Sequence, residues 1–326
     1  MARRVMGWAL VLLMVVFLVA GCSSKPKDAD VQTSVQQADT DDTQTSADVR
    51  KTVLYFRDAS GYLVPVMKRI SMEEGIAKAA LKSLVAGTTE DAKLASLGVQ
   101  STVPAGTTFD LDIAKDRATV NLKMTGKCDS KQTEQAMIGS VVNTLLGFDT
   151  VKEVSVQING QIVDKLPNGA IVEAKYTQPQ LNIEPTGAPG TADGKVELCF
   201  TNTTGKAIVP VYRVASDTDD LTTALSEMMM PADGTELVSF FPPSCDILGV
   251  SVADGVAEIN MSKEFATISD NPALEAVTLR ALTTVCTQFE GVKSVSLLVE
   301  GKAYEPTVST AAGLDGIKDG FLNYYD

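Results

Sequence analysis

The sequence of 326 residues contains no histidine. Serine and cysteine catalytic groups that depend on histidine, histidine-ligated zinc and the most common general base are therefore excluded. Basic residues are also few, since 28 lysines and arginines stand against 41 aspartates and glutamates and leave a net charge of −13. A surface this acidic repels the phosphate backbone, so we expect no nucleic-acid partner. These absences argue against most hydrolase chemistry, and we expect no small-molecule substrate.

Long hydrophobic runs are also scarce, and the one that exists lies at the N-terminus. It covers Val5 to Ala20 behind Arg3 and Arg4, and it is shorter than the roughly 20 residues that cross a bilayer as a helix. A short apolar run behind positive charges is typical of a secretory signal peptide. The run ends in four residues that resemble a bacterial lipobox: Val19, Ala20, Gly21 and Cys22.

We therefore expect residues 1–21 to be a lipoprotein signal peptide that is cleaved before Cys22. The thiol of Cys22 then receives a diacylglyceryl group, and its fatty acyl chains, such as palmitate, together with an N-acyl chain anchor the protein at the extracytoplasmic face of the cell membrane. An ordinary signal peptide with a chance cysteine is the alternative. No later segment approaches the length of about 18 apolar residues that predicts a membrane span.

Residues 22–50 predict a disordered tether. From Ser23 to Arg50 the sequence consists mostly of serine, threonine, glutamine, aspartate and lysine, with almost no large apolar residue. Such a composition cannot bury enough surface to offset the entropy of ordering. A flexible segment of this length lets the folded part stand about 30 Å from the lipid.

The remaining sequence contains one unit twice. Gly61 and Gly205 are 144 residues apart, and Asn121 and Asn260 are 139 apart, in matching sequence contexts. A nearly constant separation with small steps is typical of a duplication with changes in loop length. We therefore expect one domain over residues 51–175, a Pro- and Gly-rich linker over 176–194, a second domain over 195–306 and a C-terminal tail over 307–326.

The first half of each copy predicts two strands and a helix. Thr52 to Phe56 and Leu63 to Ile70 are rich in strand-forming residues on either side of a turn sequence, which indicates a hairpin. Ser71 and Glu74 have the spacing of a capping box, so we expect a helix that begins there and ends at about Ala86.

The second half of each copy predicts a strand pair, a helix and a last strand. The pair covers Phe109 to Ile113 and Arg117 to Leu122, and the last strand begins near Val154. Ser130 predicts the cap of the first copy's helix, and Asn271 that of its counterpart. The order is β-β-α-β-β-α-β in each copy, so the fold class is α+β, with helices packed on small sheets.

Several short motifs of the first copy lie at these predicted strands and turns: Leu54-Tyr55-Phe56-Arg57-Asp58, Gly61, Leu63-Val64-Pro65-Val66, Pro104-Ala105-Gly106-Thr107, Ala118-Thr119-Val120-Asn121-Leu122 and Val151-Lys152-Glu153-Val154. Together they resemble the GerM (GerMN) domain. A lipobox followed by two copies is similar to the sporulation and germination lipoproteins of that family. The second copy departs from the pattern, with Thr201-Asn202 for Arg57-Asp58 and Ser244-Cys245 for Gly106-Thr107.

The resemblance implies a protein of endospore formation and germination that is not an enzyme. Members of the family are held to act at the membranes around the forespore and to help assemble the ring-forming channel complex between mother cell and forespore. It therefore implies protein partners in that complex, no cofactor, and a fold similar to the ring-building folds of that machine. The alternative is a general extracytoplasmic envelope binding module for a cell-wall polymer or a sensor partner. An enzyme that uses carboxylates alone is a third hypothesis, but no acidic pair recurs in both copies.

A candidate partner-contact edge lies on the second strand of each copy. Proline has no N–H group, so a strand that contains it suits the edge of a sheet. Exposed edges bind other strands by strand addition. We therefore expect this edge to contact a component of a ring, through Val64, Pro65, Val66, Val209, Pro210 and Val211.

The remaining cysteines and carboxylates predict no catalytic or metal site. Four cysteines follow Cys22, and none has C-x-x-C spacing. We expect buried free thiols, with a Cys199–Cys286 disulfide as the alternative. Asp110 and Asp112 share one face of a strand, which we interpret as a solvated face and not a carboxylate pair.

Overall fold

The computed structural model describes residues 49–71, 75–184, 188–190, 195–213, 220–231, 233–308 and 323–324. The predicted signal peptide, Cys22 and nearly all of the tether lie outside these residues. Within the described part of the chain, no helix is both long enough and apolar enough to cross a bilayer.

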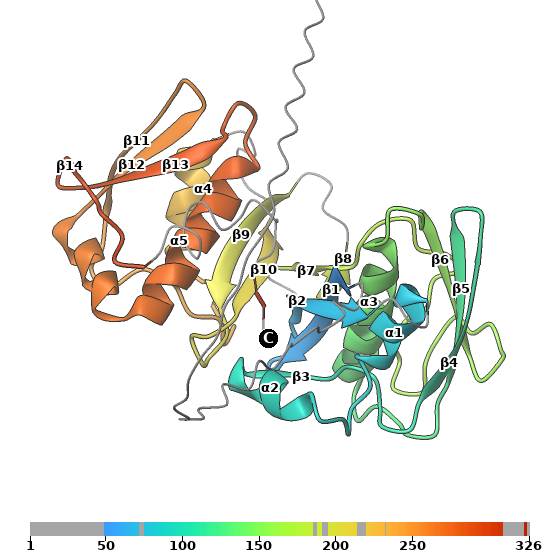
Figure 1. The fold of residues 1–326 in the computed structure, drawn as a ribbon. Helices are drawn as coiled ribbons and strands as arrows, with labels where there is room; N and C mark the ends of the chain where they lie inside the picture. The colour runs from blue at the N-terminus through green and yellow to red at the C-terminus, as the bar shows by residue number, and fades with distance from the viewer. Residues whose placement is uncertain are drawn as a thin grey trace, which may run out of the picture. The chain divides into compact units, whose positions relative to one another are not determined.

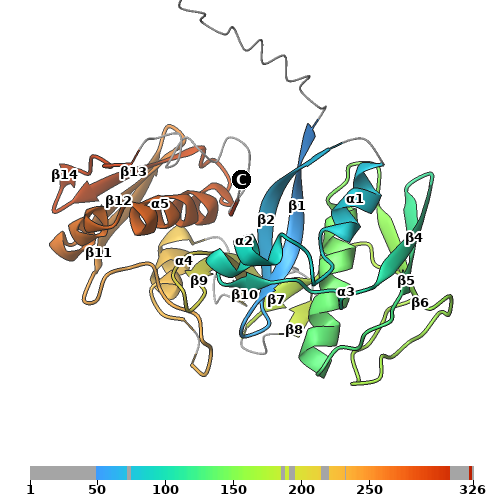
Figure 2. The same ribbon diagram turned by 60° about the horizontal axis from the view of Figure 1, so that its bottom comes forward.

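The first copy contains two three-stranded sheets with helices between them (Figures 1 and 2). One sheet has the order β2-β1-β3 and the other has the order β4-β5-β6. The elements are β1 (Val49–Asp58), β2 (Leu63–Ser71), α1 (Ile76–Lys82), α2 (Asp91–Ser96), β3 (Val99–Gln100), β4 (Thr108–Ala114), β5 (Arg117–Lys123), α3 (Lys131–Leu146) and β6 (Glu153–Ile158).

The second copy repeats this plan. Its sheets have the orders β8-β7-β10-β9 and β11-β12-β13-β14, and the first of them includes β7 (Leu181–Ile183) and β8 (Ala188–Gly190) from the segment between the copies. The elements are β9 (Val196–Thr201), β10 (Ile208–Arg213), α4 (Leu221–Met228), β11 (Ile247–Ala253), β12 (Val256–Met261), the 3₁₀ helix η1 (Lys263–Asp270), α5 (Pro272–Thr287), β13 (Ser294–Val299) and β14 (Lys302–Ala303). The predicted α+β class is confirmed, and each copy contains the predicted β-β-α-β-β-α-β series, to which the first copy adds α2 and β3 and the second adds η1 and β14.

The long helices α3 and α5 form the centre of each copy. In the first copy β5 and β6 pair in parallel, and parallel neighbours need a crossover connection, which α3 supplies. Ser130 accepts a hydrogen bond from the backbone N–H of Thr133 and forms a capping box with it, and Asn271 caps α5 in the same way from its side chain. Both helices therefore begin where the sequence predicts.

The first helix of the first copy differs from the prediction. Ser71 is the last residue of β2, where it pairs with Val49, and Glu74 lies outside the described residues. Helix α1 begins only at Ile76, after Gly75 with a φ of 76° and no side-chain cap, and it ends at Lys82. The predicted capping box is wrong because strand pairing with β1 extends β2 past Ser71, and a tertiary ladder outweighs a local cap signal.

The segment 176–194, expected to be a linker, contains two short strands, β7 (Leu181–Ile183) and β8 (Ala188–Gly190). Its path is held by α3, because the side-chain amide of Asn143 donates to the carbonyl of Gln180 at 2.7 Å and accepts from its N–H at 2.6 Å. These two bonds fix the start of the segment against the first copy.

Candidate functional site

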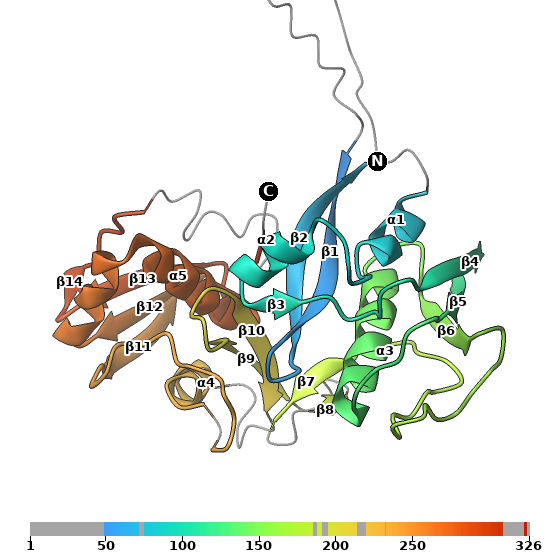
Figure 3. The same ribbon diagram turned by 90° about the horizontal axis from the view of Figure 1, so that it is seen from below.

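The six residues of the predicted edge lie on β2 and β10, which face each other between the two copies (Figure 3). The four valines are fully buried, and the two prolines are partly buried. The predicted free edge is therefore absent: β2 ends its sheet but packs against β10, and β10 lies inside its own sheet between β7 and β9. Strand addition needs unpaired backbone groups, and the pairing of these groups is completed by two asparagine side chains.

Asn182 on β7 connects β2 to β10. Its side-chain oxygen accepts from the N–H of Leu63 at 2.8 Å, and its amide donates to the carbonyls of Leu63 and Pro210, both at 2.8 Å. The side chain thus behaves like one more peptide unit inserted between two strand edges. It is 3% exposed, so these bonds are made away from water.

Asn323 repeats the arrangement with the roles of the copies exchanged. Its side-chain oxygen accepts from the N–H of Ile208 at 2.6 Å, and its amide donates to the carbonyls of Ile208 and Pro65, both at 2.8 Å. Its own carbonyl accepts from the N–H of Met67 at 2.7 Å. We name Asn182 and Asn323 the asparagine clamps.

The asparagine clamps were missed at the level of sequence, although a signal existed. They are 141 residues apart, which is also the separation of Gly160 and Gly301 in the repeat. Asn323 lies in the segment predicted to be a tail, and Asn182 in the predicted linker. A search for repeated polar residues outside the two domains would have found both.

Another contact between the copies uses a residue at which the second copy departs from the family pattern. Asn202 donates from its side-chain amide to the carbonyl of Leu97 at 2.8 Å and to that of Gly98 at 3.2 Å. The first copy has Asp58 at this position, and its carboxylate accepts from the N–H of Tyr62 within its own hairpin at 2.9 Å. A carboxylate cannot donate to a carbonyl, so the substitution by asparagine allows the contact between copies.

A second pair of repeated residues is buried in the first turn of each long helix. Glu134 on α3 accepts from the N–H of Asn168 at 2.8 Å and from that of Ala170 at 3.1 Å. Glu275 on α5 accepts from the N–H of Thr307 at 2.9 Å and from that of Val308 at 3.1 Å. Each carboxylate therefore holds the segment that follows the last strands of its copy.

The hydrogen bonds also determine the charge state of Glu275. Burial alone would raise its pKa, but the bonds from Thr307, Tyr304 and Val308 hold the pKa below the ordinary value of 4.5. The carboxylate is charged at neutral pH and has all of its partners within the fold. Glu134 and Glu275 are single residues with a structural role, and neither belongs to an acidic pair.

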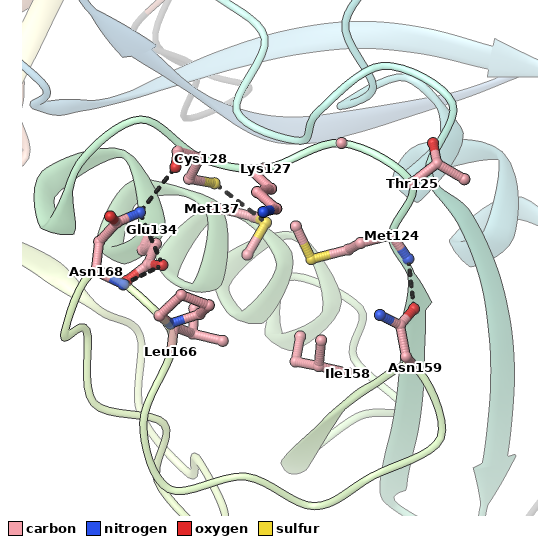
Figure 4. A pocket seen from close by; sticks show the side chains of 12 residues that line it. Met124, Thr125, Lys127, Cys128, Glu134, Met137, Ile158, Asn159, Leu166 and Asn168 are labelled. Atoms are coloured by element: carbon pink, nitrogen blue, oxygen red, sulfur yellow. Dashed lines mark hydrogen bonds between the residues drawn. The ribbon is translucent and has the colours of Figure 1, made fainter.

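The first copy contains a cavity of about 420 Å³ next to Glu134 (Figure 4). It lies between the start of α3, the end of β6 and the segment that joins β5 to α3. Its apolar lining includes Met124, Met137, Ile158 and Leu166. The sulfur of Cys128 lies 3.8 Å from that of Met137, and Asn168 donates from its side chain to the carbonyl of Cys128 at 2.7 Å.

The groups around the cavity are poorly suited to chemical attack. Burial, together with the charge of Glu134, raises the pKa of the Cys128 thiol to about 11, so the thiol stays protonated at neutral pH. Cys199, Cys245 and Cys286 are buried and free, which agrees with the expected buried thiols. Burial raises the pKa of Cys286 to about 12. Among the described residues, no group of three or more acidic or cysteine side chains could hold a metal ion.

The carboxylates on β4 have the solvated position that the sequence predicts. Asp110 and Asp112 are both exposed, and Asp110 forms an ion pair with Lys123 at 2.6 Å. The hydrogen bond from Lys123 lowers the pKa of Asp110. Cys22 and the lipobox lie outside the described residues, so their role stays a prediction.

Comparison with known proteins agrees with this duplicated architecture. The Germane family, described as sporulation and spore germination, matches residues 53–164 and again 197–305. The spore germination protein GerM of Bacillus subtilis (strain 168) is 27% identical over an alignment of 296 positions, which covers 87% of this chain and 80% of that protein. The resemblance to the GerM domain is therefore confirmed.

A solved structure shows the same fold. The tandem GerMN domains of the sporulation protein GerM from Bacillus subtilis align with a TM-score of 0.56 and 24% identity, over 82% of this chain and 99% of that one. The family match covers both copies and most of the described sequence. The chain thus belongs to the Germane family of sporulation and spore germination proteins and carries two copies of its domain.

Proposed function

We propose that the protein is a lipid-anchored factor of endospore formation and germination, and that it assembles or scaffolds the channel complex between mother cell and forespore without catalysing a reaction. The observation that carries the proposal is the family match over both copies, supported by 27% identity to GerM along most of the chain. A protein with two tandem copies of one domain presents two similar surfaces to its partners.

The contacts between the copies support a scaffolding role. The asparagine clamps satisfy backbone groups of both copies at once, and Asn202 adds bonds to the carbonyls at the end of α2. Buried, fully paired polar groups favour one arrangement over alternatives. A scaffold needs such a defined arrangement, because its partners must meet fixed faces.

The polar groups of the protein support a role without catalysis. The buried carboxylates Glu134 and Glu275 are occupied by backbone N–H groups. The thiols have raised pKa values, chiefly through burial. These carboxylates and thiols are therefore poorly suited to act as a base or a nucleophile.

The lipobox supports anchoring at the extracytoplasmic face of the membrane. Acylation at Cys22 and the tether to residue 50 would hold both domains near the surface, where a channel between two membranes is built. The Cys22→Ala variant tests the anchor without changing either domain, because the substitution lies far outside both family matches.

The test is deletion of the gene in a spore-former, followed by a count of heat-resistant spores. We expect fewer such spores, full recovery with the wild-type gene, and poor recovery with Cys22→Ala despite normal protein levels. An unchanged spore count would refute the sporulation role. Full recovery with Cys22→Ala would refute the need for anchoring.

Localisation distinguishes scaffolding at the channel from a general envelope function. A fluorescent protein is best inserted into the tether, because Asn323 near the C-terminus binds both copies. We expect enrichment at the membranes around the forespore during engulfment. A uniform envelope signal in growing cells would favour the general envelope binding module instead.

A further inference from the structure

None of the structural roles described above accounts for the cavity beside Glu134. Its volume of about 420 Å³ lies within the range of roughly 300–1,000 Å³ that is usual for ligand pockets. Methionine side chains line it from two elements, Met124 after β5 and Met137 on α3 (Figure 4). Methionine is flexible and polarizable, so a lining of this kind adapts to an entering apolar group.

The second copy fills the equivalent region with an aromatic side chain. Phe265 on η1 is fully buried. Its ring lies edge-on to that of Tyr304, with 5.5 Å between the centroids, and 6.4 Å from the ring of Phe241. This aromatic group packs beside α5 near Glu275, just as the cavity lies beside α3 near Glu134.

The repeat shows which residues differ between the filled and the open site. Phe265 and Met124 both stand six residues before the asparagine or serine that caps the long helix. Tyr304 stands three residues after Gly301, and Val163 stands three residues after Gly160. The first copy therefore has Met124 and Val163 where the second has these two rings, and its cavity lies against Met124.

A cation lies at the mouth of the cavity. Lys127 is exposed and belongs to the lining, where Figure 4 draws it among Cys128, Met137 and Met124. It makes no ion pair with the part of the chain that the structure describes. The nearby carboxylate of Glu134 is already occupied by the segment from Asn168 to Ala170. An acidic group on an entering chain would meet Lys127 without a competing partner.

We propose that the cavity of the first copy is a docking pocket for an aromatic side chain of a partner protein, and that an acidic residue beside this side chain pairs with Lys127. The ring takes the place that Phe265 fills in the second copy, and the methionines close around it. As a docking site for a channel component the pocket rests on the proposed function. Peptide binding, by contrast, is measured on the purified chain and does not depend on any spore phenotype.

The test uses the full chain, purified in detergent, with isotope-labelled methionine methyl groups. The probe is the blocked tripeptide Asp-Phe-Asp, and the readout is the methyl spectrum. We expect saturable shifts of the Met124 and Met137 methyl signals with a dissociation constant on the order of 1 mM. The signal of Met228, which is buried in the second copy, should not move. Absence of any shift at about ten times that concentration overturns the proposal.

Variants separate the pocket from unspecific binding. Met124→Phe rebuilds the filling of the second copy, so the peptide should no longer shift the Met137 signal. Lys127→Glu should weaken binding several-fold, whereas the matched control Lys263→Glu, at an exposed position on η1, should not. Equal binding of Asp-Ala-Asp, or unchanged binding by Met124→Phe, would show that the cavity does not take the ring.

Discussion

Removal of the asparagine clamps tests whether the two copies form one cooperative unit. Asn323→Ala removes three side-chain hydrogen bonds, to the N–H and carbonyl of Ile208 and to the carbonyl of Pro65. Asn182→Ala removes the matching three, to Leu63 and Pro210. Both side chains are 3% exposed, so water cannot easily replace them.

The magnitude follows from the groups left without a partner. A buried N–H that loses its acceptor costs about 1–3 kcal/mol, and a lost neutral hydrogen bond about 0.5–1.5 kcal/mol. Each carbonyl keeps a second lone pair and loses less than the N–H does. We therefore expect each single substitution to lower the free energy of unfolding by roughly 2–4 kcal/mol.

The assay is urea unfolding followed by circular dichroism. The wild type should unfold in one transition, whereas the double variant Asn182→Ala/Asn323→Ala should unfold in two, because each copy has its own sheet pair and long helix and loses its main polar tie to the other. Ile162→Ala is the control, since that side chain is 81% exposed, and it should cost much less. A cost below about 0.5 kcal/mol for either clamp, within the range of ordinary surface substitutions, would refute the reasoning.

Three further predictions concern titratable groups. Glu275→Gln should lower the free energy of unfolding by about 1–3 kcal/mol at neutral pH. The difference from the wild type should shrink in acid, because a carboxylate with a lowered pKa stabilises the fold above its ordinary pKa and loses that effect as the pH falls through the lowered value. A difference that is independent of pH would contradict this. Burial raises the pKa of Asp58 to about 6 against the opposing effect of backbone hydrogen bonds. Between about pH 4 and 6 the native state therefore keeps a proton on Asp58 that the unfolded state has lost, and the free energy of unfolding should fall by up to about 3 kcal/mol as the pH rises through this range. Carboxyl titration by NMR checks this, and a midpoint near the ordinary value would refute it. Cys199 and Cys286, both fully buried, should resist alkylation in the native protein and react only in urea; modification of the native protein would show that the thiols are accessible.

Divergence between the copies has a consistent physical pattern. Where the first copy has Asp58, the second has Asn202, and the change from acceptor to donor creates bonds to the carbonyls at the end of α2. Where the first copy has Met124, the second has Phe265, and the added ring closes the space beside its long helix. The second copy thus makes contacts to the first through Asn202, and the first copy contains an open cavity.

The sequence alone determined the duplication, the α+β class and the starts of the two long helices. These features depend on local physics, since Ser130 and Asn271 bond to backbone groups within three residues of themselves. The hairpin of β1 and β2 is also local, and Gly61 supplies the positive φ of 88° that its turn requires. Local signals act whatever the rest of the chain does, so they can be read without a structure.

Tertiary structure decided how the copies meet. Asn182 bonds to Leu63, which is 119 residues away, and Asn323 bonds to Pro65 at a separation of 258 residues. No local sequence pattern identifies such distant partners. The burial of the valines on β2 and β10 depends on these long-range contacts. The start of α1 shows the same limit, because the pairing of Ser71 with Val49 replaced its cap. The cavity beside Glu134 also required the structure, since an unfilled volume depends on the packing of three separate elements, and sequence periodicity does not record which of them leaves space.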